Sequence, residues 1–226
     1  ADDRRTELTA IDGEIDLADL IQQEDMVVTL THFGYVKRLS KSTYRTQHRG
    51  GKGVAAMTTR EEDYAEQILV MNTHEDILFF TNRGRVYVLK CYEIPEAGRT
   101  ARGTAIVNIL PLAGGEKVTT MIPVPVDTDS HYLMMATREG MIKKTSTSEF
   151  ANLRRNGLIA IILRDEDDLV GVELTDGYRE LLLGSRLGKA IRFSERHIRA
   201  MGRASMGVRS MRLEPEDSVI SMAVVE

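Results

Sequence analysis

Short runs of apolar residues recur along the 226-residue chain, and each is followed by a polar turn and a second, mixed run. Four stretches follow this pattern: MVVTLTHFGYVKRL from Met26, ILFFTNRGRVYVLK from Ile77, YLMMATREGMIKKT from Tyr132 and LLLGSRLGKAIRFS from Leu181. A nearly continuous apolar run is typical of a strand covered on both faces, and a three-residue polar loop ending in glycine is typical of a hairpin. The pattern therefore predicts four β-hairpins.

The four stretches are one repeat in a common register. With the turn glycines Gly34, Gly84, Gly140 and Gly188 numbered zero, glycine recurs at +19 in repeats one, two and four and at +17 in the third. Positions −3, +10 and +15 hold, in repeat order, Thr31, Thr81, Thr137 and Ser185; Tyr44, Ile94, Phe150 and Ile198; and Arg49, Arg99, Arg155 and Arg203.

Each repeat continues in the same way after its hairpin. We expect a basic loop with an apolar anchor at +10, a third strand (104–110, 158–163), an acidic loop and a fourth strand (67–71, 118–124, 169–174, 218–225). Four-stranded units of about 50 residues are typical of propeller blades. We predict an all-β, propeller-like β-pinwheel over 26–226, with blades near 26–76, 77–131, 132–180 and 181–226, after an acidic lead-in, 1–25. A β-sandwich with accidental similarity is the alternative.

Charge follows the repeat. The net charge is only −4, but the segments 26–57, 77–110, 132–163 and 181–213 hold 24 of the 30 Lys and Arg and 5 of the 34 Asp and Glu. In a ring or spiral of blades the equivalent loops share one side, so the basic loops would form a curved band suited to a bent polyanion. Ordinary solvated surface is the alternative reading of these loops.

The heptapeptide QHRGGKG, residues 47–53, lies in the basic loop of the first repeat. It lacks the glycine and the Ser or Thr of a nucleotide-binding P-loop, and it lies between strand-like runs, unlike a disordered RGG tail. Glycine lets backbone N–H groups approach phosphate closely. The candidate DNA-binding residues are Gln47, His48, Arg49, Gly50, Gly51, Lys52 and Gly53 in this loop, and Lys37, Arg38, Lys41, Arg45, Arg99, Arg102, Lys143, Lys144, Arg154, Arg155, Arg192, Arg199 and Arg203 elsewhere on the rim.

The sequence shows no catalytic or cofactor chemistry. The five histidines are dispersed, Cys91 is the one cysteine, and no GxSxG or GxGxxG motif is present. We therefore expect no catalytic residue, metal site or cofactor in this chain. No apolar run approaches the roughly 20 residues of a membrane span, and no secretory signal is visible, which favours a cytoplasmic protein without a membrane partner.

These motifs resemble the C-terminal domain family of the DNA gyrase A subunit, which is related to that of topoisomerase IV. QHRGGKG looks like the family's GyrA box, and THFGYVKRL and TYRTQ are similar too. The resemblance implies a β-pinwheel that binds double-stranded DNA without sequence specificity and wraps it. It implies two protein partners, the rest of gyrase A and the gyrase B subunit. It also implies that the whole enzyme, an ATP-dependent topoisomerase, uses ATP and Mg on other domains.

Two features depart from the family. His48 stands where Arg or Lys is usual, which makes one charge of the box titratable. Four repeats are visible where about six are usual, so we expect either a natural short form or a piece of a longer chain. The alternatives are the C-terminal domain of the topoisomerase IV A subunit, which usually lacks an intact box, and a protein-binding propeller without a role on DNA.

Overall fold

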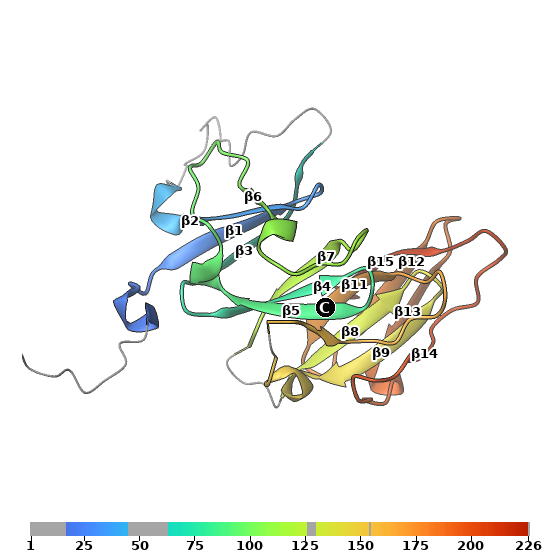
Figure 1. Cartoon of the computed structure of the whole chain (residues 1–226). Helices are drawn as coiled ribbons and strands as arrows, with labels where there is room; N and C mark the ends of the chain where they lie inside the picture. Colours follow the sequence, from blue (N-terminus) through green and yellow to red (C-terminus); the bar gives the residue numbers. More distant parts are fainter. Residues whose placement is uncertain (1–16, 45–62, 126–129, 154, 226) are drawn as a thin grey trace, which may run out of the picture.

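The computed structural model describes residues 17–44, 63–125, 130–153 and 155–225. Within them the regular structure is fifteen β-strands and six short 3₁₀ turns. The strands form four antiparallel sheets that follow one another in chain order around a common centre, an arrangement like a four-bladed propeller (Figure 1). The prediction of an all-β, propeller-like fold is confirmed. No helix among these residues is long and apolar enough to cross a membrane.

Each repeat begins with the predicted hairpin. The pairs are β1 (Asp25–Thr31) with β2 (Tyr35–Ser40), β4 (Asp76–Thr81) with β5 (Arg85–Lys90), β8 (Tyr132–Thr137) with β9 (Met141–Ser146), and β12 (Glu180–Ser185) with β13 (Ala190–Ser194). A 3₁₀ turn follows each hairpin: η2 (Lys41–Thr43), η3 (Cys91–Glu93), η5 (Thr147–Phe150) and η6 (Glu195–His197). A further 3₁₀ turn, η1 (Leu17–Leu20), precedes the first sheet.

The hairpin turn explains two of the repeated positions. The glycine at zero has a positive φ in every repeat, for example 77° at Gly34 and 70° at Gly84. This left-handed conformation suits glycine, which has no Cβ. The hydroxyl at −3 accepts a hydrogen bond from the backbone N–H that follows the glycine, as Thr31 Oγ1 does from Tyr35 at 3.1 Å. Equivalent bonds occur in the other three repeats, so all four hairpins have the same type of turn.

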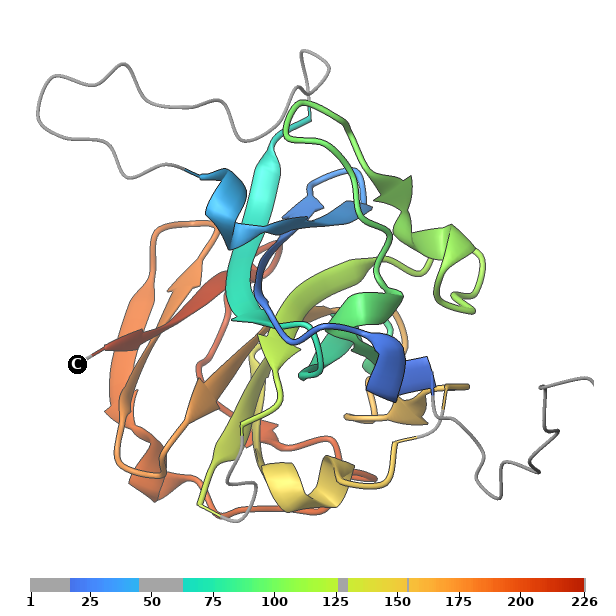
Figure 2. The same ribbon diagram turned by 90° about the vertical axis from the view of Figure 1, so that its left-hand side faces the viewer.

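The fourth strand of each repeat lies toward the centre of the array. These strands are β3 (Ala65–Asn72), β7 (Val118–Pro123), β11 (Leu169–Thr175) and β15 (Val219–Val225), as the sequence predicted. β7 contacts β3 and β11, and β11 contacts β15, so neighbouring sheets pack against each other through these central strands (Figure 2). Successive sheets enclose three apolar cores.

Burial on both faces explains the continuous apolar runs. In β4, Ile77 and Phe79 pack into the core shared with the first sheet, while Leu78 and Phe80 pack into the core shared with the third. In β12, by contrast, Leu181 lies in the core shared with the third sheet and Leu182 is exposed. The hydrophobic effect therefore stacks the sheets rather than closing each one separately.

The outermost strand of each complete sheet comes from another repeat. β6 (Thr104–Ala105) of the second repeat pairs with β2 of the first, and β14 (Val208–Arg209) of the fourth pairs with β9 of the third. β10 (Leu158–Ile159) of the third repeat likewise pairs with β5 of the second. The expectation that one repeat supplies all four strands of its sheet is therefore wrong. Within the described residues the last sheet has three strands, in the order β13-β12-β15.

The exchanged strands are shorter than expected, and a glycine is required directly before β6 and β14. The predicted third strand at 104–110 is a two-residue strand followed by the 3₁₀ turn η4 (Ile106–Asn108). Gly103, at +19, has φ 93°, and a Cβ there would lie 2.5 Å from the carbonyl oxygen of Val36. Gly207 similarly faces the carbonyl of Ile142. At these two positions the repeated glycine is therefore explained by a close backbone approach between neighbouring repeats, whereas Gly157 of the third repeat faces the ring of Tyr87.

Candidate nucleic-acid interface

The basic loops run along the outer edges of the sheets. We call three described segments, 94–103, 151–153 with 155–157, and 199–207, the rim loops. The first of them lies parallel to β2: the N–H of Arg38 donates to the carbonyl of Pro95, and the N–H of Ala97 donates to the carbonyl of Arg38, both at 3.2 Å. Lys144 and Ala200 form a similar parallel bridge in the third sheet. Each rim loop therefore borders a sheet formed mainly by the preceding repeat.

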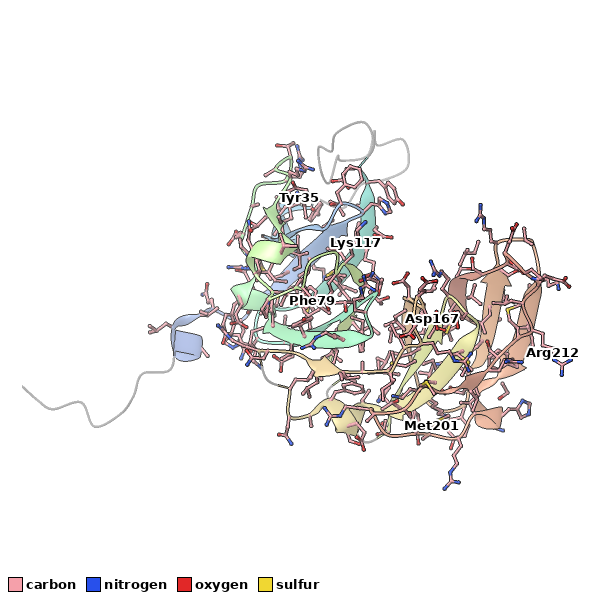
Figure 3. The ribbon with its side chains drawn as sticks, turned by 45° about the vertical axis from the view of Figure 1, so that its right-hand side comes forward. Tyr35, Phe79, Lys117, Asp167, Met201 and Arg212 are labelled. Carbon is pink, nitrogen blue, oxygen red and sulfur yellow. The ribbon has the colours of Figure 1, made fainter. Side chains whose placement is uncertain are left out.

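Several predicted cations are exposed at this periphery. Arg99, Arg155 and Arg199 lie on the rim loops and are exposed, as are Lys41 in η2 and Arg192 in β13. Three of them pair with a carboxylate: Lys41 with Asp25, Arg155 with Glu93 and Arg192 with Glu180. Ion pairs at exposed positions are weak and exchange readily, so an anionic ligand competes with these carboxylates for the cations. Arg212, labelled in Figure 3, is a further exposed cation on the outer side of the last sheet.

Lys37 and Lys143 differ from the expected rim cations because both are buried, with 1% and 0% of their surface exposed. The ammonium group of Lys37 donates to the carbonyls of Gly98, Arg99 and Ala101 at 3.2, 2.7 and 2.9 Å. Both lysines occupy position +3 of their repeats. Their ammonium groups hold the backbone of a rim loop and do not face solvent, so they offer no direct phosphate contact.

Lys143 makes the equivalent contacts in the third sheet. Its ammonium group donates to the carbonyl of Ala160 at 2.7 Å and to that of Arg203, the +15 arginine of the next repeat. Burial lowers the pKa of Lys143 to about 8, because removal from water disfavours the charged ammonium. Burial also lowers the pKa of Lys37.

Four more predicted rim residues are partly or wholly withdrawn from solvent, and one of them is Arg203, which is half-buried. Lys144 is buried, lies 3.1 Å from the carboxylate of Glu195 and stacks over the ring of Tyr132. Arg38 donates from Nε to the carbonyl of Ile94 at 2.7 Å, and the guanidinium of Arg102 lies over a tyrosine ring. These side chains connect neighbouring repeats, and their burial corrects the expectation that every basic residue of the loops faces outward.

The remaining candidates lie outside the described residues. They are the glycine-rich loop Gln47, His48, Arg49, Gly50, Gly51, Lys52 and Gly53, together with Arg45 and Arg154. Their assignment remains a prediction from the sequence. The described neighbours on either side, Tyr44 and Asp63, are partly buried and buried.

The acidic loops lie at the hairpin turns, and Asp63 Oδ2 also lies 4.0 Å from Arg102 Nε of the first rim loop. Asp63, Asp167 and Asp217 each accept a hydrogen bond from a backbone N–H of a turn, with the Asp63 Oδ1 to Phe33 N distance at 3.0 Å. Figure 3 shows Asp167 on the inner side of the array, opposite the side that carries Arg212. The sequence analysis did not predict this turn-capping role. Its signal in the sequence is an acidic residue shortly before the fourth strand of each repeat.

Other kinds of site find no support in the described part of the chain. No group of three or more His, Cys, Asp or Glu side chains there could hold a metal ion. The acidic run 165–168 is instead used in part to cap a turn. The anchors expected at +10 are buried at Ile94, Phe150 and Ile198, which supports a packing role for this position.

Comparison with known proteins identifies a family. A sequence profile described as the DNA gyrase C-terminal domain, beta-propeller, matches residues 25–70, 75–125, 131–176 and 179–226. The chain is 52% identical over 212 residues to the DNA gyrase A subunit of Haemophilus influenzae and 50% identical over 223 residues to that of Escherichia coli. These alignments cover 94% and 99% of this chain but 24% and 26% of the relatives, so the chain spans about a quarter of their length.

Two solved structures are also similar. One is the C-terminal domain of DNA topoisomerase IV, with a TM-score of 0.78 and 32% identity over 91% of this chain and 62% of that one. The other is the DNA gyrase A C-terminal domain, with a TM-score of 0.68 and 29% identity over 90% of this chain and 66% of that one.

Proposed function

Because the chain belongs to the DNA gyrase C-terminal domain family, we propose that it binds double-stranded DNA along its rim loops and bends the duplex around the array of sheets. The observation that carries the proposal is the position of these loops. Each runs along the outer edge of a sheet, and exposed cations such as Arg99, Arg155 and Arg199 recur on them from sheet to sheet.

The proposed binding is electrostatic and independent of base sequence. Lys and Arg that neutralise phosphates release condensed counterions, which supplies affinity and makes it strongly dependent on salt. A sharp bend over 20 to 30 base pairs costs on the order of 1 to 10 kcal/mol, and contacts at several sheets would offset this cost. The exposed arginines are suited to phosphate because the guanidinium is always charged and donates in a planar fork.

The proposal extends to the whole enzyme. In it, the domain acts within a gyrase A subunit, together with a gyrase B subunit, in the cytoplasm. The wrapped duplex biases strand passage so that ATP hydrolysis elsewhere in the enzyme yields negative supercoils. The chain itself supplies binding and shape, and the catalytic residues and the ATP and Mg sites belong to other domains.

Two experiments test this. In a gel shift with a long linear duplex, binding at low salt should weaken along a steep line of log affinity against log salt. A relaxed plasmid ligated in the presence of the chain should then show a changed linking number. A duplex left unbound at low salt would overturn the proposal. In the full enzyme, replacement of residues 47–53 by alanine should abolish supercoiling while relaxation persists.

A second candidate is the equivalent domain of the topoisomerase IV A subunit, favoured by the TM-score of 0.78 to the C-terminal domain of DNA topoisomerase IV. The same plasmid assay separates the two functions. A topoisomerase IV domain would support relaxation by its full enzyme without introducing supercoils, and replacement of residues 47–53 would then leave the activity profile unchanged.

A further inference from the structure

The charge of the residue at position +9 of the repeat differs from blade to blade. It is the residue that follows the hairpin in the 3₁₀ turn: Thr43, Glu93, Glu149 and His197 in repeat order. Because the rim loops are exchanged, this position faces the rim loop of the following repeat, where the +15 arginine lies.

In the second and third sheets position +9 is a carboxylate that contacts that arginine. Arg155 Nη2 is in direct contact with Glu93 Oε1. The other oxygen of Glu93 accepts a hydrogen bond from the N–H of Lys90 at 2.8 Å, so the carboxylate is held in place from its own repeat. In the next sheet, Arg203 Nε lies 3.8 Å from Glu149 Oε2.

The first sheet lacks this carboxylate. Position +9 there is Thr43, and the rim arginine is Arg99, which is exposed and makes no side-chain ion pair or hydrogen bond within the part of the chain that the structure describes. The nearby acid of the same loop, Glu96, lies 3.4 Å from Arg38 and so has a cation of its own. Within the described residues no carboxylate therefore competes with a ligand for the charge of Arg99.

Building on the DNA-binding role proposed above, we propose that Glu93 and Glu149 compete with DNA phosphate for the rim arginines. A phosphate that binds Arg155 must displace Glu93, which leaves this carboxylate without its cation. The gain in binding free energy from the arginine is therefore offset, and the pair adds little net positive charge to the DNA-binding surface. Arg99 delivers a whole charge. The two glutamates therefore make DNA binding weaker at the second and third sheets than at the first sheet.

The expected size follows from the weakness of exposed ion pairs. Such pairs contribute between nothing and about a fivefold change in an equilibrium constant. Glu93→Gln and Glu149→Gln should each raise the affinity of the 226-residue chain for a long duplex about two- to fivefold. Each should also steepen the slope of log affinity against log salt by up to about 0.9, the increment for one additional neutralised phosphate.

Reciprocal and coupled variants make the test specific. Thr43→Glu should lower the affinity and flatten the slope by similar amounts. In the Arg155→Ala background, Glu93→Gln should change the affinity no more than Glu216→Gln does, since its partner is absent. Glu216→Gln is the matched control, because it removes the same charge from an exposed acidic loop. The amide introduced by Glu93→Gln keeps an oxygen for the N–H of Lys90, and thermal unfolding checks that each variant is folded.

The outcomes separate this inference from the proposed function. If the wild-type chain leaves the duplex unbound at low salt, the DNA-binding role itself fails. If the wild type binds with a steep slope but Glu93→Gln, Glu149→Gln and Thr43→Glu change affinity and slope no more than Glu216→Gln does, the competition is overturned while DNA binding stands.

Discussion

The ammonium group of Lys37 lies 2.7 Å from the carbonyl oxygen of Arg99, so a buried cation in the first sheet holds the backbone of the exposed arginine that the second repeat supplies. Two further carbonyls of the same loop complete its hydrogen bonding. The position of Arg99 at the rim thus depends on a side chain about sixty residues away.

Replacing Lys37 by methionine should cost stability and weaken DNA binding together. Methionine fills similar space but leaves three carbonyls without their donor, and we expect a loss of about 1 to 3 kcal/mol in the free energy of unfolding. Urea denaturation measures this, with Lys41→Met as a control, since Lys41 directly follows β2 and is exposed. Equal stability losses in the two variants would contradict the anchoring role of Lys37.

Lys143 should make stability depend on pH above neutrality. Its pKa is lowered by burial from 10.5 to about 8, so the native state releases this proton near pH 8 while the unfolded chain keeps it until about pH 10.5. Between these values the unfolded state binds more protons, so this residue's contribution to the free energy of unfolding rises with pH.

The measurement is a urea titration of wild type and Lys143→Met at several pH values from 7 to about 10.5. The difference between the two proteins should be constant below pH 8 and should shift in favour of wild type above it. A difference that stays level across the whole range would show that the native Lys143 keeps an ordinary pKa.

Gly103 should tolerate no side chain. An alanine Cβ would lie 2.5 Å from the carbonyl oxygen of Val36, at a φ of 93°, so Gly103→Ala should lower the free energy of unfolding by at least about 2 kcal/mol. Gly98→Ala, in the same loop, meets no atom within 4 Å and should change stability by less than about 1 kcal/mol. Similar effects of the two substitutions would argue against the strand exchange at this point.

Cys91 should be inert in the folded protein. Its side chain is fully buried, and burial raises the pKa of the thiol to about 11, so little thiolate forms near neutral pH. A colourimetric thiol reagent at about pH 8 should label it only at the rate of unfolding, and readily in denaturant. Rapid labelling without denaturant would show that the core between the first and second sheets opens locally.

His48 should give DNA binding a pH dependence that comes from the glycine-rich loop. Free imidazole titrates near about pH 6.5, so the DNA affinity should rise as the pH falls from about 7.5 to about 6. His48→Arg should remove this rise, because arginine stays charged throughout. A flat profile in wild type, or an unchanged slope in the variant, would exclude His48 as the titrating group.

Sequence periodicity was sufficient to predict the hairpins and their stacking. The alternation of Ile77, Leu78, Phe79 and Phe80 between two cores is a local consequence of strand geometry, and continuous apolarity implies burial on both faces. The strand exchange was not predictable in this way. β6 is two residues long, and its partner β2 lies some seventy residues earlier, so no short-range pattern specifies the pairing.

The same distinction between sequence and tertiary structure applies to the basic residues of the candidate interface. The sequence alone determined that basic residues gather on one loop of every repeat, because charge and periodicity are properties of the chain order. Only the tertiary structure decided which of them face outward. Lys37 and Arg99 are equally basic in the sequence, but the exchanged loop covers the first and exposes the second, since a buried ammonium is tolerated where backbone carbonyls from another repeat replace its water.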